Sequence, residues 1–198
     1  SPTFSKLNEY WYKQSLFKDK LNVKIGKQDI NFDFCALGSA FQFSNGGFYM
    51  QNVPLQTYPF PGMGVTGSFS PVSLLTVRSG WIDGAPDLYS NLGLGTMFDG
   101  KDGYMNIHEV NLNANIKGHA GKYMFGGWIN TSNVPELTTS RIPRMLSSSY
   151  GFYSGFDQVI YMEKKDNSQG LSLFGQFGWA PSSRRYVDKY FGAGIVYK

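Results

Sequence analysis

The chain has 198 residues, of which 41% are hydrophobic, 17% aromatic and only 16% charged, with 24 glycines and a formal net charge of +4. This composition excludes a disordered chain, which carries more charge and fewer aromatics, and a bundle of Ala-, Leu- and Glu-rich helices. No stretch approaches 18 consecutive apolar residues, which argues against a transmembrane helix. The positive charge is dispersed, unlike that of a nucleic-acid-binding surface. The single cysteine, Cys35, excludes an intrachain disulfide and a Cys-based metal cluster.

Nine segments alternate apolar and polar residues with period 2, which predicts strands. In chain order they are Lys6–Gln14, Lys20–Lys27, Met63–Phe69, Ser73–Ile82, Tyr104–Asn115, Lys122–Thr131, Phe152–Lys164, Leu171–Trp179 and Tyr190–Lys198. In Phe152–Lys164 two sets of residues compete for the apolar face, so the orientation of this strand stays open.

The connections between these segments alternate between short and long. Short turns are expected at Ser15–Asp19, Ser70–Val72, Ile116–Gly121 and Lys165–Gly170, long ones at Gln28–Gly62, Asp83–Gly103 and Ser132–Gly151, and an intermediate one at Ala180–Lys189. Outer-membrane barrels have short turns at one end, long loops at the other, and strands that are apolar outward and polar inward. The pattern therefore favours an all-β fold, an antiparallel up-and-down transmembrane β-barrel. A soluble β-sandwich or lectin-like jelly roll alternates in the same way and is the alternative.

The two ends of the chain suggest a fragment. The first residues lack the charged and apolar regions of a signal peptide, and the last five, Gly194–Lys198, stop within an alternating pattern. We expect residues 1–198 to form a single β-barrel domain that lacks N-terminal and C-terminal strands.

Several short motifs resemble the carbohydrate-selective porin family known as OprB. Lys6–Ser15, with a Trp-Tyr-x-Gln core, is followed by a strand that ends Gly-Lys-x-Asp at Gly26–Asp29, and Asn31–Phe34 continues the similarity. Further similar stretches, in family order, are Thr57–Pro59, Pro61–Gly64, Phe174–Pro181 and Gly192–Lys198.

The resemblance implies the middle portion of a sixteen-stranded barrel about twice this length. It also implies an outer-membrane porin of a Gram-negative-type cell envelope, which lets small saccharides diffuse passively through a water-filled lumen. The expected partners are small saccharides, the lipid bilayer with its lipopolysaccharide, and other barrels with which it could associate; no nucleic acid is expected. A soluble or surface-attached carbohydrate-binding β protein is the alternative function.

Charged side chains and two tryptophans on the polar faces of the strands are candidate pore-lining residues. A Lys or Arg facing lipid at the midplane costs about 2–4 kcal/mol, so these side chains should face water. Trp11 and Trp128 are candidates for stacking on sugar rings, although either could belong to an interfacial girdle, and Arg78 with Glu109 is the candidate polar pair. Alternatively, each residue could simply make the pore wall hydrophilic without binding a sugar. The full set is Glu9, Trp11, Lys13, Lys24, Arg78, Glu109, Lys122, Trp128 and Asp157.

The long connection Gln28–Gly62 is rich in aromatic residues, and loops of this length usually have a function or are disordered. We predict that it folds inward and narrows the lumen, with Asp29 and Asp33 near the mouth and Phe41 and Tyr58 among its constriction residues. The alternative is an extracellular cap packed on its own aromatic side chains.

Enzyme-like motifs are weak. Gly62–Gly67 fits G-x-G-x-x-G, but Pro59 and Pro61 precede it and an alternating strand follows, so it lacks the strand and helix of a dinucleotide site. His108 and His119, eleven residues apart, have no carboxylate cluster around them, which makes a zinc site improbable. We therefore expect no enzyme activity, no cofactor and no metal.

Overall fold

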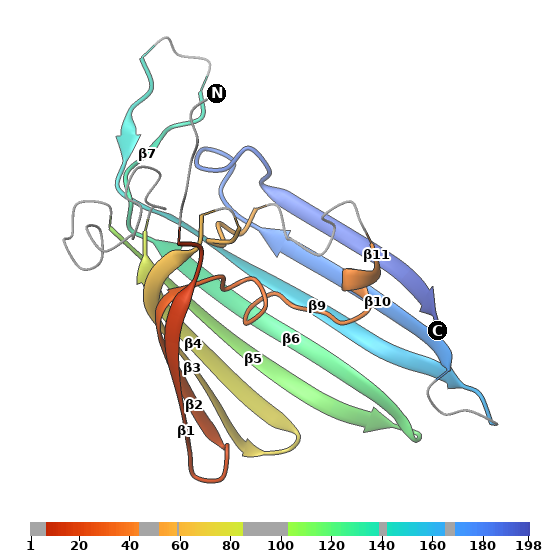
Figure 1. Ribbon diagram of the computed structural model, residues 1–198. Coiled ribbons are helices and arrows are strands. Elements are labelled where there is room, and N and C mark those ends of the chain that lie inside the picture. The colour runs from red at the N-terminus through yellow and green to blue at the C-terminus, as the bar shows by residue number, and fades with distance from the viewer. Residues whose placement is uncertain (1–6, 44–51, 59, 85–102, 139–141, 165–168) are drawn as a thin grey trace, which may run out of the picture.

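A computed structural model of the chain describes residues 7–43, 52–58, 60–84, 103–138, 142–164 and 169–198. These residues form one curved antiparallel sheet and a small two-stranded hairpin (Figure 1). The strands are β1 (Tyr10–Leu16), β2 (Leu21–Gln28), β3 (Gly62–Val72), β4 (Leu75–Asp83), β5 (Tyr104–Ile116), β6 (His119–Asn130), β7 (Val134–Pro135), β8 (Met145–Leu146), β9 (Ser149–Met162), β10 (Gly170–Trp179) and β11 (Lys189–Tyr197), and a 3-10 turn, η1, spans Ala40–Gln42. No helix among the described residues is long and apolar enough to cross a membrane.

The nine strands of the large sheet follow one another in chain order, β1-β2-β3-β4-β5-β6-β9-β10-β11. All neighbours are antiparallel, and the β7–β8 hairpin lies within the connection from β6 to β9. The sheet is therefore an up-and-down meander, as the alternation of short and long connections predicts. Within this chain it is open, because β1 and β11 form its two edges.

Several strands are longer than the sequence pattern predicts. β6 begins at His119 instead of Lys122, because Ile116 pairs with His119 and only Lys117 and Gly118, with φ of 53° and 87°, make the turn. Two consecutive residues with positive φ are the mark of the tight hairpin turn that suits twisted strands. β9 likewise begins at Ser149, three residues before the predicted start.

The two faces of the sheet differ in chemistry. Its convex face presents apolar side chains that are 39–61% exposed, among them Val77, Val110, Phe125 and Ile195. Aromatic pairs such as Trp81–Tyr104, with ring centroids 5.2 Å apart, and Tyr150–Trp179, at 6.3 Å, gather on this face where the long connections leave the sheet. The concave face carries the charged and polar residues of the same strands.

A bulge in β9 explains why its sequence pattern is ambiguous. Ser172 of β10 pairs with Val159 while Leu171 pairs with Tyr161, so Ile160 is an extra residue. A bulge shifts the alternation by one position. Asp157, before the bulge, lies on the concave face of the sheet. Tyr161, beyond the bulge, lies on the convex face, although both positions are odd-numbered in the same strand.

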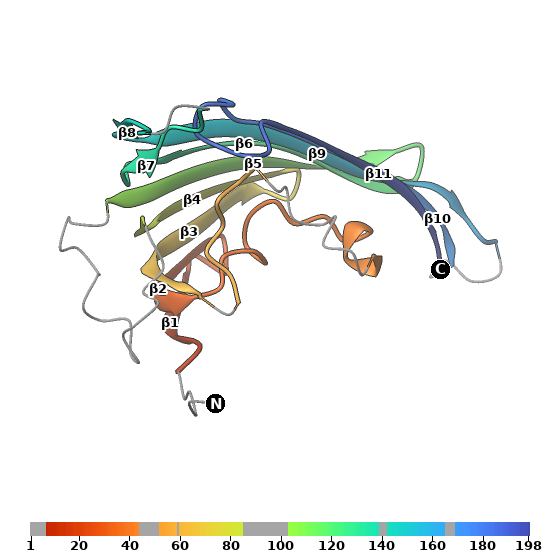
Figure 2. The same ribbon diagram turned by 90° about the horizontal axis from the view of Figure 1, so that it is seen from above.

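The core of the molecule lies between the concave face and residues from the long connection between β2 and β3 (Figure 2). Ile30, Phe34, Leu37 and Ala40 of this connection are at most 1% exposed. They pack with strand residues of the same buried cluster, which are Ile82, Met105, Ile107, Met124, Trp128, Tyr153, Phe174 and Val196. We call residues 29–43 the inner segment.

Candidate functional site

The inner segment crosses the concave face from strand to strand, and charged side chains of successive strands hold successive parts of it. The first contacts are made at Asp33. Its carboxylate lies 2.6 Å from Nζ of Lys24 on β2. Nη1 of Arg78 on β4 donates to the backbone oxygen of Asp33 at 2.5 Å. Asp33 thus accepts hydrogen bonds from cationic side chains on two strands, β2 and β4.

Glu109 on β5 holds the next residue of the segment. Its carboxylate accepts hydrogen bonds from the backbone N–H of Cys35 at 2.8 Å, from the Tyr153 hydroxyl at 3.0 Å and from Nδ2 of Asn111 at 2.6 Å. Arg78 adds an ion pair at 3.6 Å. A buried carboxylate is tolerated only when it is paired and hydrogen-bonded, and this network meets that need for a side chain with no exposed surface.

Lys122 and Asp157 complete the series on β6 and β9. Nζ of Lys122 donates to the backbone oxygen of Ala36 at 2.7 Å. The Asp157 carboxylate accepts from both the backbone N–H and the hydroxyl of Ser39, each at 2.7 Å. Five of the nine candidate pore-lining residues (Lys24, Arg78, Glu109, Lys122 and Asp157) therefore contact residues 33–39 of the inner segment, in the order of their strands.

Glycines on the concave face make room for the segment. A Cβ added at Gly80 would lie 3.2 Å from Cζ of Phe34, and one at Gly155 would lie 3.1 Å from Cδ1 of Leu37. Such distances are tighter than most Cβ contacts, so a side chain at either position would have to displace the segment where it crosses the strand.

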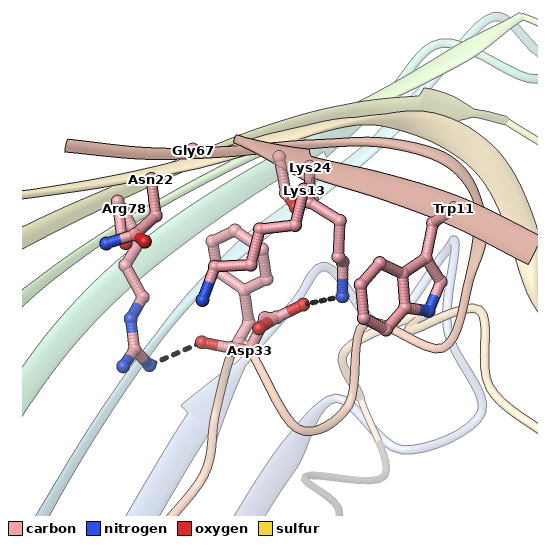
Figure 3. Close-up of a pocket in the computed structure, with 10 residues that line it drawn as sticks. Trp11, Lys13, Asn22, Lys24, Asp33, Gly67 and Arg78 are labelled. Carbon is pink, nitrogen blue, oxygen red and sulfur yellow. Dashed lines mark hydrogen bonds and ion pairs between the residues drawn. The ribbon is translucent and has the colours of Figure 1, made fainter. Parts of the chain in front are cut away.

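An open pocket of about 340 Å³ lies beside the inner segment, over β1 to β4 (Figure 3). Trp11, half exposed, forms one side, and Nζ of Lys24 lies 5.3 Å from the centroid of its ring. The remaining polar residues lining the pocket include Lys13, Asp33, Ser68 and Arg78. The pocket thus combines an accessible aromatic face with several charged groups, which is a suitable surface for a polar, ring-shaped solute.

The remaining two candidate pore-lining residues, Glu9 and Trp128, lie outside the lining of this pocket. Glu9 accepts a hydrogen bond from the backbone N–H of Asp29 at 3.0 Å, at the start of the inner segment. Trp128 is only 4% exposed and belongs to the buried cluster, so its ring face is covered by protein. Of the two tryptophans, only Trp11 has a face open to a solute.

The four candidate constriction residues have different environments. The Asp29 carboxylate is buried and accepts bonds from the backbone N–H groups of Asn31 and Tyr58 and from the Thr57 hydroxyl. It therefore ties the start of the inner segment to residues 57–58. Asp33 lines the pocket, Phe41 stacks on Phe32 with ring centroids 5.9 Å apart, and the Tyr58 side chain is 74% exposed.

Sequence patterns alone do not reveal several residues that build this site. Cys35 is buried with φ of 58°, a left-handed conformation that non-glycine residues rarely adopt, and it presents its N–H to Glu109. Tyr153 and Asn111 support the same carboxylate from other strands. Their contacts span 44 and 74 positions for Tyr153 and Cys35, so no local pattern could identify them.

Burial raises the pKa of the Cys35 thiol, and the charge of Glu109 raises it further. The thiol therefore stays protonated near neutral pH and is a poor nucleophile. Among the described residues, no group of three or more His, Cys, Asp or Glu side chains could hold a metal ion. The candidate site thus has three parts, which are the concave face of the sheet, the inner segment bound to it and the polar pocket beside Trp11.

A curved up-and-down sheet with an apolar convex face, a polar concave face and a segment lying inside it defines the wall of a β-barrel channel of the outer-membrane type. Comparison with known proteins agrees with this class. The sequence profile of the Carbohydrate-selective porin, OprB family matches residues 4–198, so the chain belongs to this family.

The fold is also similar to that of a solved structure, OprB from Pseudomonas putida, with a TM-score of 0.80 at 24% sequence identity. The match covers 98% of this chain and 50% of that chain, so this chain spans about half the length of the protein it matches. At this identity the likeness shows the fold alone. The comparison with curated protein sequences found no match.

Proposed function

We propose that the protein to which this chain belongs is an outer-membrane porin that lets small saccharides diffuse passively through a water-filled lumen. The observation that carries the proposal is the pocket between the inner segment and β1–β4, where Trp11 stands beside charged side chains. An aromatic ring can stack on the C–H face of a pyranose, while Arg78, Lys13 and Asp33 exchange hydrogen bonds with its hydroxyls. Membership of the carbohydrate-selective porin family supports the same assignment.

The inner segment sets the width of the lumen in this proposal. Its contacts with five strands hold it against the wall, so it narrows the channel without closing it. Binding in such a channel must be weak, because conduction requires that a solute can leave as readily as it enters. Half-exposed Trp11 and partly exposed polar groups fit this requirement better than a closed pocket would.

Liposome swelling tests the proposal directly. The full-length protein is reconstituted, and uptake of glucose is compared with uptake of an amino acid of similar size. Faster uptake of glucose supports a saccharide-preferring channel, and Trp11→Ala should then reduce the preference while Phe125→Ala, a change on the convex face, leaves it unchanged. Equal uptake of the two solutes would leave a general porin and reject the sugar preference, whereas uptake of neither solute would reject the channel itself.

A further inference from the structure

Two cationic side chains lie on the convex face, at the end of the sheet from which the long connections leave. Lys189 begins β11 and pairs with Trp179 of β10, so the two side chains share this face. Arg184 belongs to the connection between these strands, and its Cζ lies 5.8 Å from the centroid of the Tyr150 ring. The rings of Tyr150 and Trp179 are themselves 6.3 Å apart. The two cations therefore flank an aromatic pair that faces outward.

Hydrogen bonds hold Arg184 in this position. Its backbone N–H donates to the oxygen of Pro181 at 3.0 Å, and the N–H of Leu137 donates to the oxygen of Ser183 at 2.8 Å. The second bond ties this connection to the one that carries the β7–β8 hairpin, at the same end of the sheet (Figure 1). Nη1 of Arg184 donates to the backbone oxygen of Ser148. A guanidinium has several N–H donors, so this neutral acceptor leaves both its charge and further donors available.

Neither cation is neutralised by the residues that the structure describes. No ion pair joins Arg184 or Lys189 to a carboxylate of these residues. The acid next to Lys189 is Asp188, whose backbone oxygen accepts a hydrogen bond from the N–H of Ala180 at 2.8 Å and so continues the β10–β11 ladder. Because side chains alternate along a strand, Asp188 is directed to the other face of the sheet. Unpaired cations on a lipid-facing surface are costly within hydrocarbon and favourable beside anionic headgroups.

We propose that Arg184 and Lys189 bind a phosphate group of lipopolysaccharide, the lipid of the outer leaflet. The inference rests on the proposed outer-membrane location and goes beyond sugar transport. Long connections are on the outside of outer-membrane barrels, and Tyr and Trp rings gather at the level of the headgroups. Tyr150 and Trp179 therefore mark the level at which lipid A presents its phosphates. Arginine binds phosphate through paired hydrogen bonds, and lysine adds a second charge.

Binding of lipid A to the full-length protein in detergent tests this site. Native mass spectrometry measures the apparent affinity for lipid A with its phosphates and for the same lipid A after their removal. Wild type should prefer the phosphorylated form. Arg184→Gln and Lys189→Gln should each lower the ratio of the two affinities about fivefold, because one cation near an anionic surface contributes close to that factor. Arg184→Lys should lower the ratio less, and added salt should reduce the preference of the wild type.

Lys117→Gln is the matched control, because it removes the same charge from the β5–β6 turn, at the other end of the sheet, and should leave the ratio unchanged. A wild-type ratio in both Arg184→Gln and Lys189→Gln would overturn the phosphate site. Displacement of lipid A by an equal concentration of inorganic phosphate would also overturn it, since the cations would then bind a free anion.

Glucose uptake into liposomes, measured with the same proteins, separates this inference from the proposed function. Arg184→Gln should leave uptake unchanged, because the site is on the opposite face of the sheet from the polar pocket. Uptake of glucose without any preference for phosphorylated lipid A would reject the lipid site and leave the channel. A phosphate-dependent ratio without uptake would reject the channel and support the lipid site.

Discussion

The Glu109 carboxylate joins the barrel wall to the inner segment at a single buried point. It accepts hydrogen bonds from three residues and lies 3.6 Å from Arg78, all without contact with water. Removal of one partner from such a network leaves the other polar groups unsatisfied, which costs about 1–3 kcal/mol for each buried group. The residue is therefore better placed to hold the segment than to contact a solute.

We expect Glu109→Ala to release the Cys35 region from the wall. Cys35 is 1% exposed and its thiol pKa is raised by burial, so maleimide should modify it slowly in the wild-type protein. Loss of the carboxylate should raise the rate of maleimide modification at least about tenfold. A loss of about 1.4 kcal/mol in the free energy that holds the segment against the wall corresponds to that factor. The readout is modification of the Cys35 peptide in the folded, reconstituted protein, followed by mass spectrometry.

Glu136→Gln serves as the control, because Glu136 lies in the connection after β6 and makes no hydrogen bond or ion pair with the described residues of the inner segment. A Cys35 rate that stays at the wild-type value in Glu109→Ala would show that the other four contacts of the wall hold the segment without Glu109. Glu109→Gln, which keeps the shape and one acceptor oxygen, should give an intermediate rate.

At the scale of elements, the strands could be predicted from the sequence and the inner segment only in part. Period-2 alternation predicts all nine strands of the large sheet because each strand has one apolar and one polar face. Ile160 shows the limit of the method, since the bulge it creates depends on pairing with β10 and leaves no local signal. The path of the segment depends on contacts such as Glu109 with Cys35, which a local pattern cannot contain.

Concave-face glycines are a second feature of the strands that alternation does not explain. Gly155 on β9 faces Leu37 of the inner segment, and a Cβ there would also lie 2.7 Å from Cε of Met124 and 3.1 Å from the backbone oxygen of Gly175. A larger residue at position 155 would therefore have to displace both the segment and side chains of the adjacent strands. Overpacking of such a site typically costs about 1–3 kcal/mol.

Gly155→Val should push Leu37 off the wall and raise the rate of Cys35 modification, while the barrel still forms. Gly127→Val is the comparison, because Gly127 is on β6 and an added Cβ there would meet only the backbone oxygen of Gly151 at 3.6 Å. The same maleimide assay measures both variants. Equal Cys35 rates in the two variants would show that the strand glycines do not make room for the segment.

At the scale of the whole molecule, the sheet separates two environments. Val77, Val110 and Phe125 form one row across β4, β5 and β6 on the convex face, at 39%, 41% and 60% exposure. So many exposed apolar side chains are costly in water and favourable in lipid. Aromatic pairs at the ends of the strands, such as Trp81–Tyr104, would lie at the level of the lipid headgroups.

Two adjacent residues of β4 test this division, because their side chains point to opposite faces. Val77→Lys places a charge on the convex face, where lipid contact costs about 2–4 kcal/mol at the midplane and less toward the strand ends. Thr76→Lys places the same charge on the concave face, next to water, and should cost much less. Unfolding of the full-length protein from lipid bilayers in urea would measure both free energies. Equal losses for the two variants would mean that the convex face is in water too, as in a soluble sheet, and the assignment of that face to the membrane would be wrong.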